Sequence, residues 1–419
     1  MSALVSLVYP WFSLVGGAFA AGSMILALRM ISGALRWVCL TLLAAGGLGY
    51  GAAWLLGAPW DLAAVLSLNQ WLIAMLVGLT FLRLLPLPAR GAARRPTGVR
   101  AMAETMLAAH LIGSVVNIAA VSLVGHGLRR HPLSRGDGSL VGFAFALSAF
   151  WSPIWVGYAA VAAYAPSAQM WLVSLFGLGL AVMSLGLLLV GLHRAEPTAW
   201  GAFSGFALSM DSLRFPALLM GLVLVLRVLL DGPSIVLLVL VAALCLSVLA
   251  LGLRHGRSAG PLLTRHLKHG VTRIAGEVAV FASAGFFGGG VGLLLSTVEG
   301  PDWQLGQSTG VWLAWAGPVL MVGLAVLGVH PLVSLVMFAS AALPMGLDPT
   351  LFAMAGVIGW GASLPANPLS GLNLLLGGAF GVNVREMVPM NVLWSGAIVL
   401  LSLPLLMAFE AAVQGFGQG

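Results

Sequence analysis

Charged side chains are scarce in this chain of 419 residues, where 12 acidic and 19 basic residues together make up 7% of the sequence. An ordinary soluble domain is roughly a quarter charged, so this chain has too little charge to cover a surface that faces water. Hydrophobic residues make up 60% of the sequence and form repeated apolar runs, each long enough to cross a bilayer. Composition therefore excludes an ordinary soluble protein and predicts an all-α, multi-pass membrane protein embedded in lipid.

Cysteine is nearly absent, and its two occurrences, Cys39 and Cys245, both lie inside apolar runs. A disulfide framework or a zinc framework is therefore excluded. The histidines are scattered, and no expected helix carries a pair at the spacing that metal ligands require. Without such ligands or a paired nucleophile and base inside the bilayer, we expect no enzyme and no resident cofactor. The net charge of +7 serves orientation in the membrane, and we expect no nucleic-acid partner.

Acidic residues are also missing from the middle of the apolar runs, where they would indicate proton coupling. The nearest candidates are Glu104 and Glu277, close to Arg100 and Arg273 at basic boundaries. We interpret both as solvated ion pairs. Coupling to Na⁺ through neutral oxygens is slightly preferred over coupling to H⁺, and both ions stay open.

About ten apolar runs are expected to cross the membrane as helices. They are 4–28, 34–56, 62–82, 139–163, 168–192, 213–230, 233–253, 274–298, 350–378 and 388–409. Basic residues cluster after the first and third runs, and the positive-inside rule places those loops in the cytoplasm. We therefore expect a bacterial inner-membrane protein with both termini in the periplasm.

Two further segments, 101–128 and 310–345, are predicted to form re-entrant helical hairpins. If 101–128 crossed the membrane, the basic loop at 129–138 and every later basic loop would face outward. Gly, Ser and Asn within 113–117 provide residues that can leave helical geometry at its tip. The segment 310–345 is flanked by acidic residues and broken before Pro331, so we expect it to enter from the opposite side, after an external loop at 299–309.

An internal repeat relates the two halves of the chain. An offset of 211 or 212 residues places 137–140 (Asp-Gly-Ser-Leu) on 348–351 (Asp-Pro-Thr-Leu), and also superposes the two hairpins. Each repeat holds five crossings and one hairpin, and five is odd, so the second repeat is inverted. The predicted boundaries are repeat 1 at 1–192, a cytoplasmic linker at 193–212 and repeat 2 at 213–419.

The crossing after each hairpin carries helix-breaking residues at membrane depth. In 145–155 they are Ser and Pro, and in 359–373 they are Pro, Asn, Ser and Gly. A broken helix presents half-helix N-termini to an anion, while carbonyl, Ser and Asn oxygens can hold Na⁺. The alternative is a packing kink at each proline.

This plan resembles the ion transporter superfamily, which includes divalent-anion/sodium symporters and the large subunits of TRAP-type carboxylate transporters. The stretches 346–349 (Gly-Leu-Asp-Pro) and 364–374 are similar to the "G-hydrophobic-D-P … T-P-P-x-G-x-N-L" run of TRAP large subunits. The stretch 114–117 (Ser-Val-Val-Asn) resembles the Ser-Asn-Thr hairpin tip of the symporters, with two inserted valines and no threonine. The resemblance implies elevator-type secondary transport, here symport, on a homodimeric scaffold built from the remaining crossings.

Carried over by this resemblance, the candidate substrate- and ion-binding residues lie at the hairpin tips and the breaks. In the first half they are Ser114, Asn117, Ser148, Trp151, Ser152 and Pro153, and in the second half they are His330, Ser334, Ser363, Pro365, Asn367, Ser370 and Asn373. A possible Na⁺ position lies near Asn117 and near Asn367. Asn117 and His330 could instead cap half-helices. Trp151, Trp155 and Trp360 either wall a cavity or anchor at the interface, and His110 is expected to pack within its hairpin.

The sequence thus predicts a secondary active transporter for a small anion, either a carboxylate or an oxyanion. Two alternatives stay open. One is the membrane subunit of a tripartite system that uses a periplasmic solute-binding protein. The other is an ion channel, because broken helices also form selectivity filters. The residues do not name the substrate.

Overall fold

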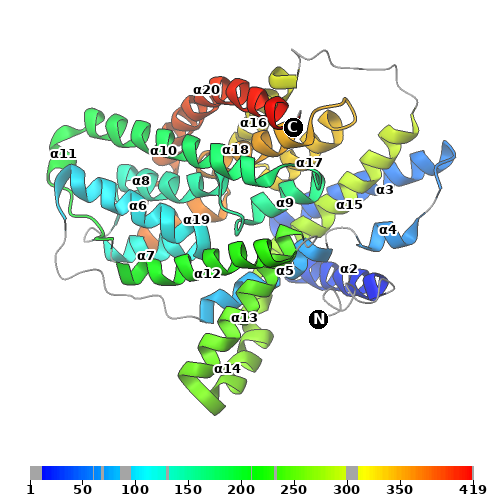
Figure 1. The fold of residues 1–419 in the computed structure, drawn as a ribbon, viewed down its shortest axis with the longest axis horizontal. Coiled ribbons are helices and arrows are strands. Elements are labelled where there is room, and N and C mark those ends of the chain that lie inside the picture. The colour runs from blue at the N-terminus through cyan, green and yellow to red at the C-terminus, as the bar shows by residue number, and fades with distance from the viewer. Residues whose placement is uncertain are drawn as a thin grey trace. The chain divides into compact units, whose positions relative to one another are not determined.

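The computed structural model describes residues 12–59, 61–67, 70–84, 96–128, 132–208, 210–230, 234–298 and 310–417. The elements in these ranges are helices, joined by one isolated β-bridge between Thr97 and Ser204 (Figure 1). Six segments of the described chain are long and apolar enough to cross a membrane, and four shorter apolar helices accompany them. The all-α membrane class is confirmed, while the count of ten crossings stays a prediction.

Helices coincide with the predicted crossings wherever the structure describes the chain. The first three crossings are α2 (Phe12–Met30), α3 (Gly33–Leu55), and α4 (Leu62–Ser67) with α5 (Gln70–Thr80) and η1 (Phe81–Leu84). The next two are α8 (Arg135–Ala146) with η2 (Leu147–Phe150) and α9 (Val156–Tyr164), and then α10 (Met170–Ala195). The others are α12 (Met210–Leu229), α13 (Ile235–His255), α15 (Ala275–Thr297), α18 (Pro349–Ala366) with α19 (Gly371–Phe380), and α20 (Val384–Gly417).

The chain divides into two compact units. Unit 1 comprises Met1–Leu85, Leu230–Leu305 and Val336–Gly346, and unit 2 comprises Pro86–Leu229, Gly306–Leu335 and Leu347–Gly419. Each unit combines segments from both halves of the sequence, so the units are a different division from the predicted repeats. We expected α10, α12 and α20 to belong to the scaffold, but all three belong to unit 2 with the predicted hairpins and breaks.

Glycines allow close packing within unit 1. A Cβ at Gly49 or Gly290 would overlap the backbone of the partner helix, so α3 and α15 touch main chain to main chain. Small residues allow such contacts between membrane helices, where apolar side chains alone give little net attraction.

The basic segment after α13 was expected to be a loop but is mostly helical. It contains η3 (Gly256–Ser258), α14 (Ala259–Arg265), a π-helical turn at His266–Gly270 and η5 (Val271–Ile274). The buried His266 fixes this segment to α5, because its Nε2 lies 2.9 Å from Thr80 Oγ1. The edge of its ring also packs against Phe81.

The predicted hairpin at 101–128 consists of α6 (Gly98–Val116) and α7 (Ala119–Gly127). The start of α6 and the end of α7 both lie against the segment 203–206. Gly98 N donates to Phe203 O at 2.9 Å, and Gly127 packs against the ring of Phe206. The chain therefore reverses between the two helices, at Asn117, where φ is +57°.

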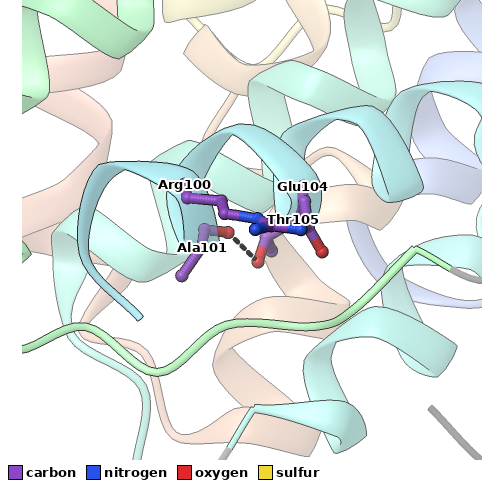
Figure 2. Close-up of polar contacts among 4 residues, drawn as sticks. All are labelled: Arg100, Ala101, Glu104 and Thr105. Carbon is purple, nitrogen blue, oxygen red and sulfur yellow. Dashed lines mark hydrogen bonds and ion pairs between the residues drawn. The ribbon is translucent and has the colours of Figure 1, made fainter. Parts of the chain in front are cut away.

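The predicted linker at 193–212 lies against the start of α6. It contains the short helix α11 (Pro197–Gly201), and its next residues pair with the start of α6. Figure 2 shows that turn of α6, where Thr105 Oγ1 donates to Ala101 O and also accepts from Phe206 N at 2.9 Å. Arg100 and Glu104 form the expected ion pair there at 2.7 Å, with 79% and 23% of their side chains exposed.

The predicted hairpin at 310–345 consists of α16 (Gly310–Val326) and α17 (Pro331–Ala342). Contacts with α18 show where the chain reverses. Met321 on α16 packs against Gly359, and Leu335 on α17 packs against Gly356. Between them Val329 O accepts from Asn367 Nδ2 at 2.9 Å, so the chain runs past the end of α18 and returns.

Candidate functional site

Two interrupted helices lie at the centre of unit 2. The first runs from α8 through η2, leaves helical geometry at Trp151, and resumes at Val156 as α9. The second is α18, which ends at Ala366 and resumes at Gly371 as α19. We call the connecting residues 151–155 break 1 and 367–370 break 2. Both predicted breaks are therefore present.

An acidic residue stabilises the start of each interrupted helix. Asp137 and Ser134 form a capping box at the start of α8. Asp348 Oδ1 accepts from Thr350 N at 2.8 Å and from Leu351 N at 2.9 Å, at the start of α18. Carboxylates that accept from the first amides of a helix satisfy its unpaired donors. The repeated acidic motif found in the sequence is thus a pair of helix caps.

Break 1 is tied to the tip of the first hairpin by Ser152. Its Oγ donates to Ser114 O in a short hydrogen bond and accepts from Ile154 N at 3.3 Å. Ser148 Oγ donates to Phe145 O at 2.6 Å and accepts from Trp155 Nε1 at 2.8 Å. Both serines are fully buried, so in this arrangement their hydroxyl groups hold the protein together.

His110 and Trp151 form a second tie between the same elements. Trp151 Nε1 donates to His110 Nε2 at 2.9 Å, and His110 Nδ1 lies 2.9 Å from Ala144 O. His110 is 2% exposed and so is buried as expected, but both of its hydrogen-bond partners lie outside its hairpin. Its bridge to break 1 was missed, because spacing along one helix carries no information about a partner 41 positions away.

Break 2 is tied to the tip of the second hairpin by Asn367. Its Nδ2 donates to Val329 O at 2.9 Å, and its Oδ1 accepts from Leu369 N at 2.8 Å. Pro368, half-buried between these partners, supplies no amide hydrogen of its own. In each half, one polar side chain of the break therefore donates to a carbonyl at a hairpin tip.

The side chain of Asn373 bonds to main-chain carbonyl groups at break 2. Its Nδ2 donates to Pro365 O at 2.9 Å and to Asn367 O at 2.8 Å, while its main-chain N–H donates to Ser370 Oγ at 3.1 Å. Its Oδ1 is buried and has no hydrogen-bond partner among the described residues. A buried amide oxygen without a partner is uncommon and costly, so this atom is an acceptor available to a ligand.

Asn117, at the tip of the first hairpin, has positive φ and is half-buried. Its Oδ1 accepts from Ile118 N at 2.8 Å, which is the capping role considered as the alternative. Its Nδ2 donates to no group in the described part of the chain. Ile118 contacts Gly371, which places this tip beside the start of α19.

The remaining predicted residues have local roles. His330 Nδ1 accepts from Leu332 N at 3.2 Å, which caps α17, and the imidazole edge faces Trp360 with 6.0 Å between ring centroids. Ser334 Oγ donates to His330 O at 3.4 Å, and Ser363 Oγ donates to Trp360 O at 2.9 Å. Pro153 is half-buried within break 1.

Trp155 and Trp360 are buried, at 4% and 5% exposure, so neither is an interfacial anchor in this structure. Trp360 packs against Gly157 at the start of α9, and Gly361 packs against Phe150. These contacts place α18 against η2 and α9. Both breaks therefore lie in one packed core rather than in separate regions of unit 2.

Asn391 on α20 was not among the predicted residues. Its Oδ1 accepts from Ser139 Oγ at 2.5 Å, and its Nδ2 donates to Pro365 O at 3.0 Å. Ser395, one turn later, donates to Ala362 O at 2.7 Å. An amide and a hydroxyl group four residues apart in an apolar run indicate a buried polar contact. The prediction did not include them because it placed 388–409 in the scaffold.

Charge is sparse around these residues. Among the described residues, no group of three His, Cys, Asp or Glu side chains could hold a metal ion. The donors and acceptors of the site are amides, hydroxyl groups, main-chain carbonyls and two imidazoles. Such groups bind a small ion or polar molecule by hydrogen bonding and partial charges.

No protein-family model matches the chain, and no curated protein matches it. Among solved structures, the chain is similar to the YdaH transporter of Alcanivorax borkumensis, described as having an unusual topology. The TM-score is 0.50 and the sequence identity 15%, and the similarity covers 98% of each chain. At this identity the similarity establishes the fold alone. The resemblance to the ion transporter superfamily stays a prediction.

Proposed function

We propose that this chain is a secondary active transporter that moves a small anion, a carboxylate or an oxyanion, across a bacterial inner membrane. The observation that carries the proposal is the pairing of each hairpin with a break through side-chain hydrogen bonds. Ser152 bonds to Ser114 O and Trp151 to His110 in the first half, and Asn367 bonds to Val329 O in the second. Hairpins joined to interrupted helices in this way bring the polar groups of the tips and the breaks together in one candidate site. A fold similar to a transporter over nearly its full length supports the same function.

Opposed directions of the two interrupted helices support the inverted repeat within this proposal. Along α18, Gly361 contacts Phe150, Trp360 contacts Gly157, and Gly356 contacts Val161, so α18 runs antiparallel to the segment from η2 to α9. Each first hairpin arm, α6 or α16, runs parallel to the helix that follows its hairpin. Inverted repeats with antiparallel broken helices supply the inward- and outward-open states of many transporters.

An anion is the proposed substrate because the site offers half-helix N-termini and no fixed negative charge. The amides at the starts of α9 and α19 are donors that an anion can use. Asn117 Nδ2 adds a donor beside the start of α19. The buried Asn373 Oδ1 suits instead a hydroxyl group of the substrate or a coupling cation such as Na⁺.

Elevator motion is the mechanism that we propose for this site. Unit 2 contains both hairpins, apart from the second part of α17, and both breaks, so it would carry the substrate, while unit 1 would supply the scaffold and the contact with a second copy in a homodimer. A periplasmic binding protein is not required by this scheme. An adjacent gene for such a protein would favour the tripartite alternative.

The test begins with purified protein, screened by thermal shift against organic acids and oxyanions in Na⁺ and in K⁺. The stabilising compound is then used for uptake into proteoliposomes. We predict that Asn117→Ala and Asn367→Ala each abolish uptake while the protein still folds and keeps its oligomeric state, with a melting temperature lowered modestly by the lost hydrogen bonds. The matched control is Asn383→Ala, since Asn383 precedes α20 and its side-chain amide donates to the exposed Glu386 at 2.6 Å. Wild-type uptake in both site variants would overturn the site.

A further inference from the structure

The tie between His110 and Trp151 has an acid–base property that the other ties of unit 2 lack. An indole N–H can only donate, so Nε2 of His110 must present its lone pair to Trp151. A carbonyl can only accept, so Nδ1 must carry the proton that points to Ala144 O. Two hydrogen bonds of 2.9 Å thus fix one neutral tautomer of a buried imidazole.

A proton and Trp151 therefore compete for the same atom. Binding of H⁺ to Nε2 would direct an N–H group at the indole N–H, and the hydrogen bond between α6 and break 1 would be lost. Conversely, the lone pair can accept a proton once the hairpin and the break separate. Proton binding to Nε2 and the hydrogen bond from Trp151 exclude each other, so they are thermodynamically linked. Each weakens the other by the same free energy.

We propose that His110 Nε2 is a proton-binding site that couples H⁺ to the opening of the first hairpin away from break 1. The inference rests on the proposed transport function, which it deepens by naming H⁺ as a coupling ion. This choice replaces the slight preference for Na⁺ drawn from the sequence, which considered carboxylates alone.

Other charged or titratable side chains on the elements around α6 do not engage His110. Neither η2 nor α11 carries one. The described groups on α6 itself and on α7, α8, α10 and α12 are Arg100, Glu104, His126, Arg135, Asp137, His193, Arg194, Arg214 and Arg227. Arg214 and Arg227 are exposed, and Asp137 is held in the capping box of α8. In the described chain, none of these groups bonds to the imidazole of His110, whose two partners are Trp151 and Ala144.

The main chain of Trp151 is held separately from its indole. Its carbonyl accepts from Ser174 Oγ on α10 at 2.9 Å, and Ser174 Oγ lies 2.7 Å from Tyr158 OH. Release of the indole would leave the Trp151 backbone anchored to α10. The hairpin would then move, while break 1 stays with the core of unit 2.

The first experiment is nuclear magnetic resonance of ¹⁵N-histidine-labelled protein in lipid nanodiscs. It needs no substrate. His110→Gln identifies the His110 signals among the eight histidines. We expect the Nδ1–H tautomer at neutral pH, with the Nε2 signal moved by Trp151→Phe. The Nε2–H tautomer, or a doubly protonated ring in this state, would overturn the proposal.

The second experiment measures opening. Ile118→Cys at the hairpin tip, in a background with Cys39→Ala and Cys245→Ala, is reacted with a membrane-impermeant maleimide across the pH range. We expect acidification to raise the labelling rate, expressed relative to that of a freely exposed cysteine at the same pH, on the order of tenfold, as for a typical coupling. Adding His110→Gln, which keeps a donor and an acceptor but cannot titrate, should remove this dependence. Adding Trp151→Phe should make labelling fast even at neutral pH.

The matched control is His126→Gln, which removes an exposed imidazole from the same hairpin and should leave the pH dependence intact. An unchanged pH dependence in the His110→Gln protein would overturn the proposal. If labelling follows these expectations but no compound is taken up, the transport function fails and the proton site stands. If uptake depends on Asn367 but the pH dependence of labelling does not depend on His110, the proton site fails and the transport function stands.

Discussion

Single side chains join the hairpins to the interrupted helices, and each acts through one or two hydrogen bonds. Ser152, Asn367 and His110 all bond to groups on elements distant in the sequence. Serine and asparagine at these positions were predicted because short polar residues in apolar runs need partners. The identity of each partner was not predictable, since it depends on how the hairpins fold back.

A prediction at this scale concerns Ser152→Ala. The hydroxyl group is fully buried and bonds to Ser114 O, so its loss should lower the free energy of unfolding by about 1 kcal/mol. Chemical unfolding in mild detergent measures the change. Ser122→Ala is the control, because Ser122 lies on α7 with a weak contact of 3.5 Å to His126. Equal stability of the two variants would show that the tie contributes nothing.

At the scale of whole helices, close packing depends on glycine. On α10, a methyl group at Gly177 would overlap the carbonyl oxygen of Phe150 in η2, whereas Gly179 has open space around it. The sequence predicted helix 168–192 and the interruption after 145, since apolar length and proline determine both. It could not predict that α10 packs on the interruption, because lipid-facing and protein-facing sides of an apolar helix look alike in composition.

Gly177→Ala and Gly179→Ala form a matched pair that tests this packing. The first should force α10 away from η2 and lower the free energy of unfolding by about 1–3 kcal/mol, the usual cost of overpacking. The second should be neutral or slightly stabilising, since alanine favours helix over glycine. Thermal unfolding of both proteins in the same detergent measures the difference in stability. A Gly177→Ala protein as stable as the Gly179→Ala protein would contradict the packing described.

At the scale of the whole molecule, the breaks and the hairpins, apart from the second part of α17, belong to one unit, and α2, α3, α5, α13 and α15 belong to the other. The sequence predicted the placement of these helices by hydropathy and assigned α10, α12 and α20 to the scaffold, whereas the structure packs these three helices in unit 2 with the breaks. Asn391 shows why: its partners, Ser139 and Pro365, belong to two different interrupted helices. An amide that joins segments 252 and 26 positions away has no signature in a single sequence.

The inverted topology is the central claim, and the loops at 129–138 and 299–309 test it most directly. Residues 129–131 and 299–309 lie outside the described residues, so the test rests on the sequence. Single cysteines at His131 and Gln304, each in the background with Cys39→Ala and Cys245→Ala, are labelled with an impermeant maleimide in intact cells and in inverted vesicles. We expect the cysteine at 304 to react in intact cells and the cysteine at 131 to react in inverted vesicles. Labelling of both positions from the same side would contradict the inversion and, with it, the proposed transport mechanism.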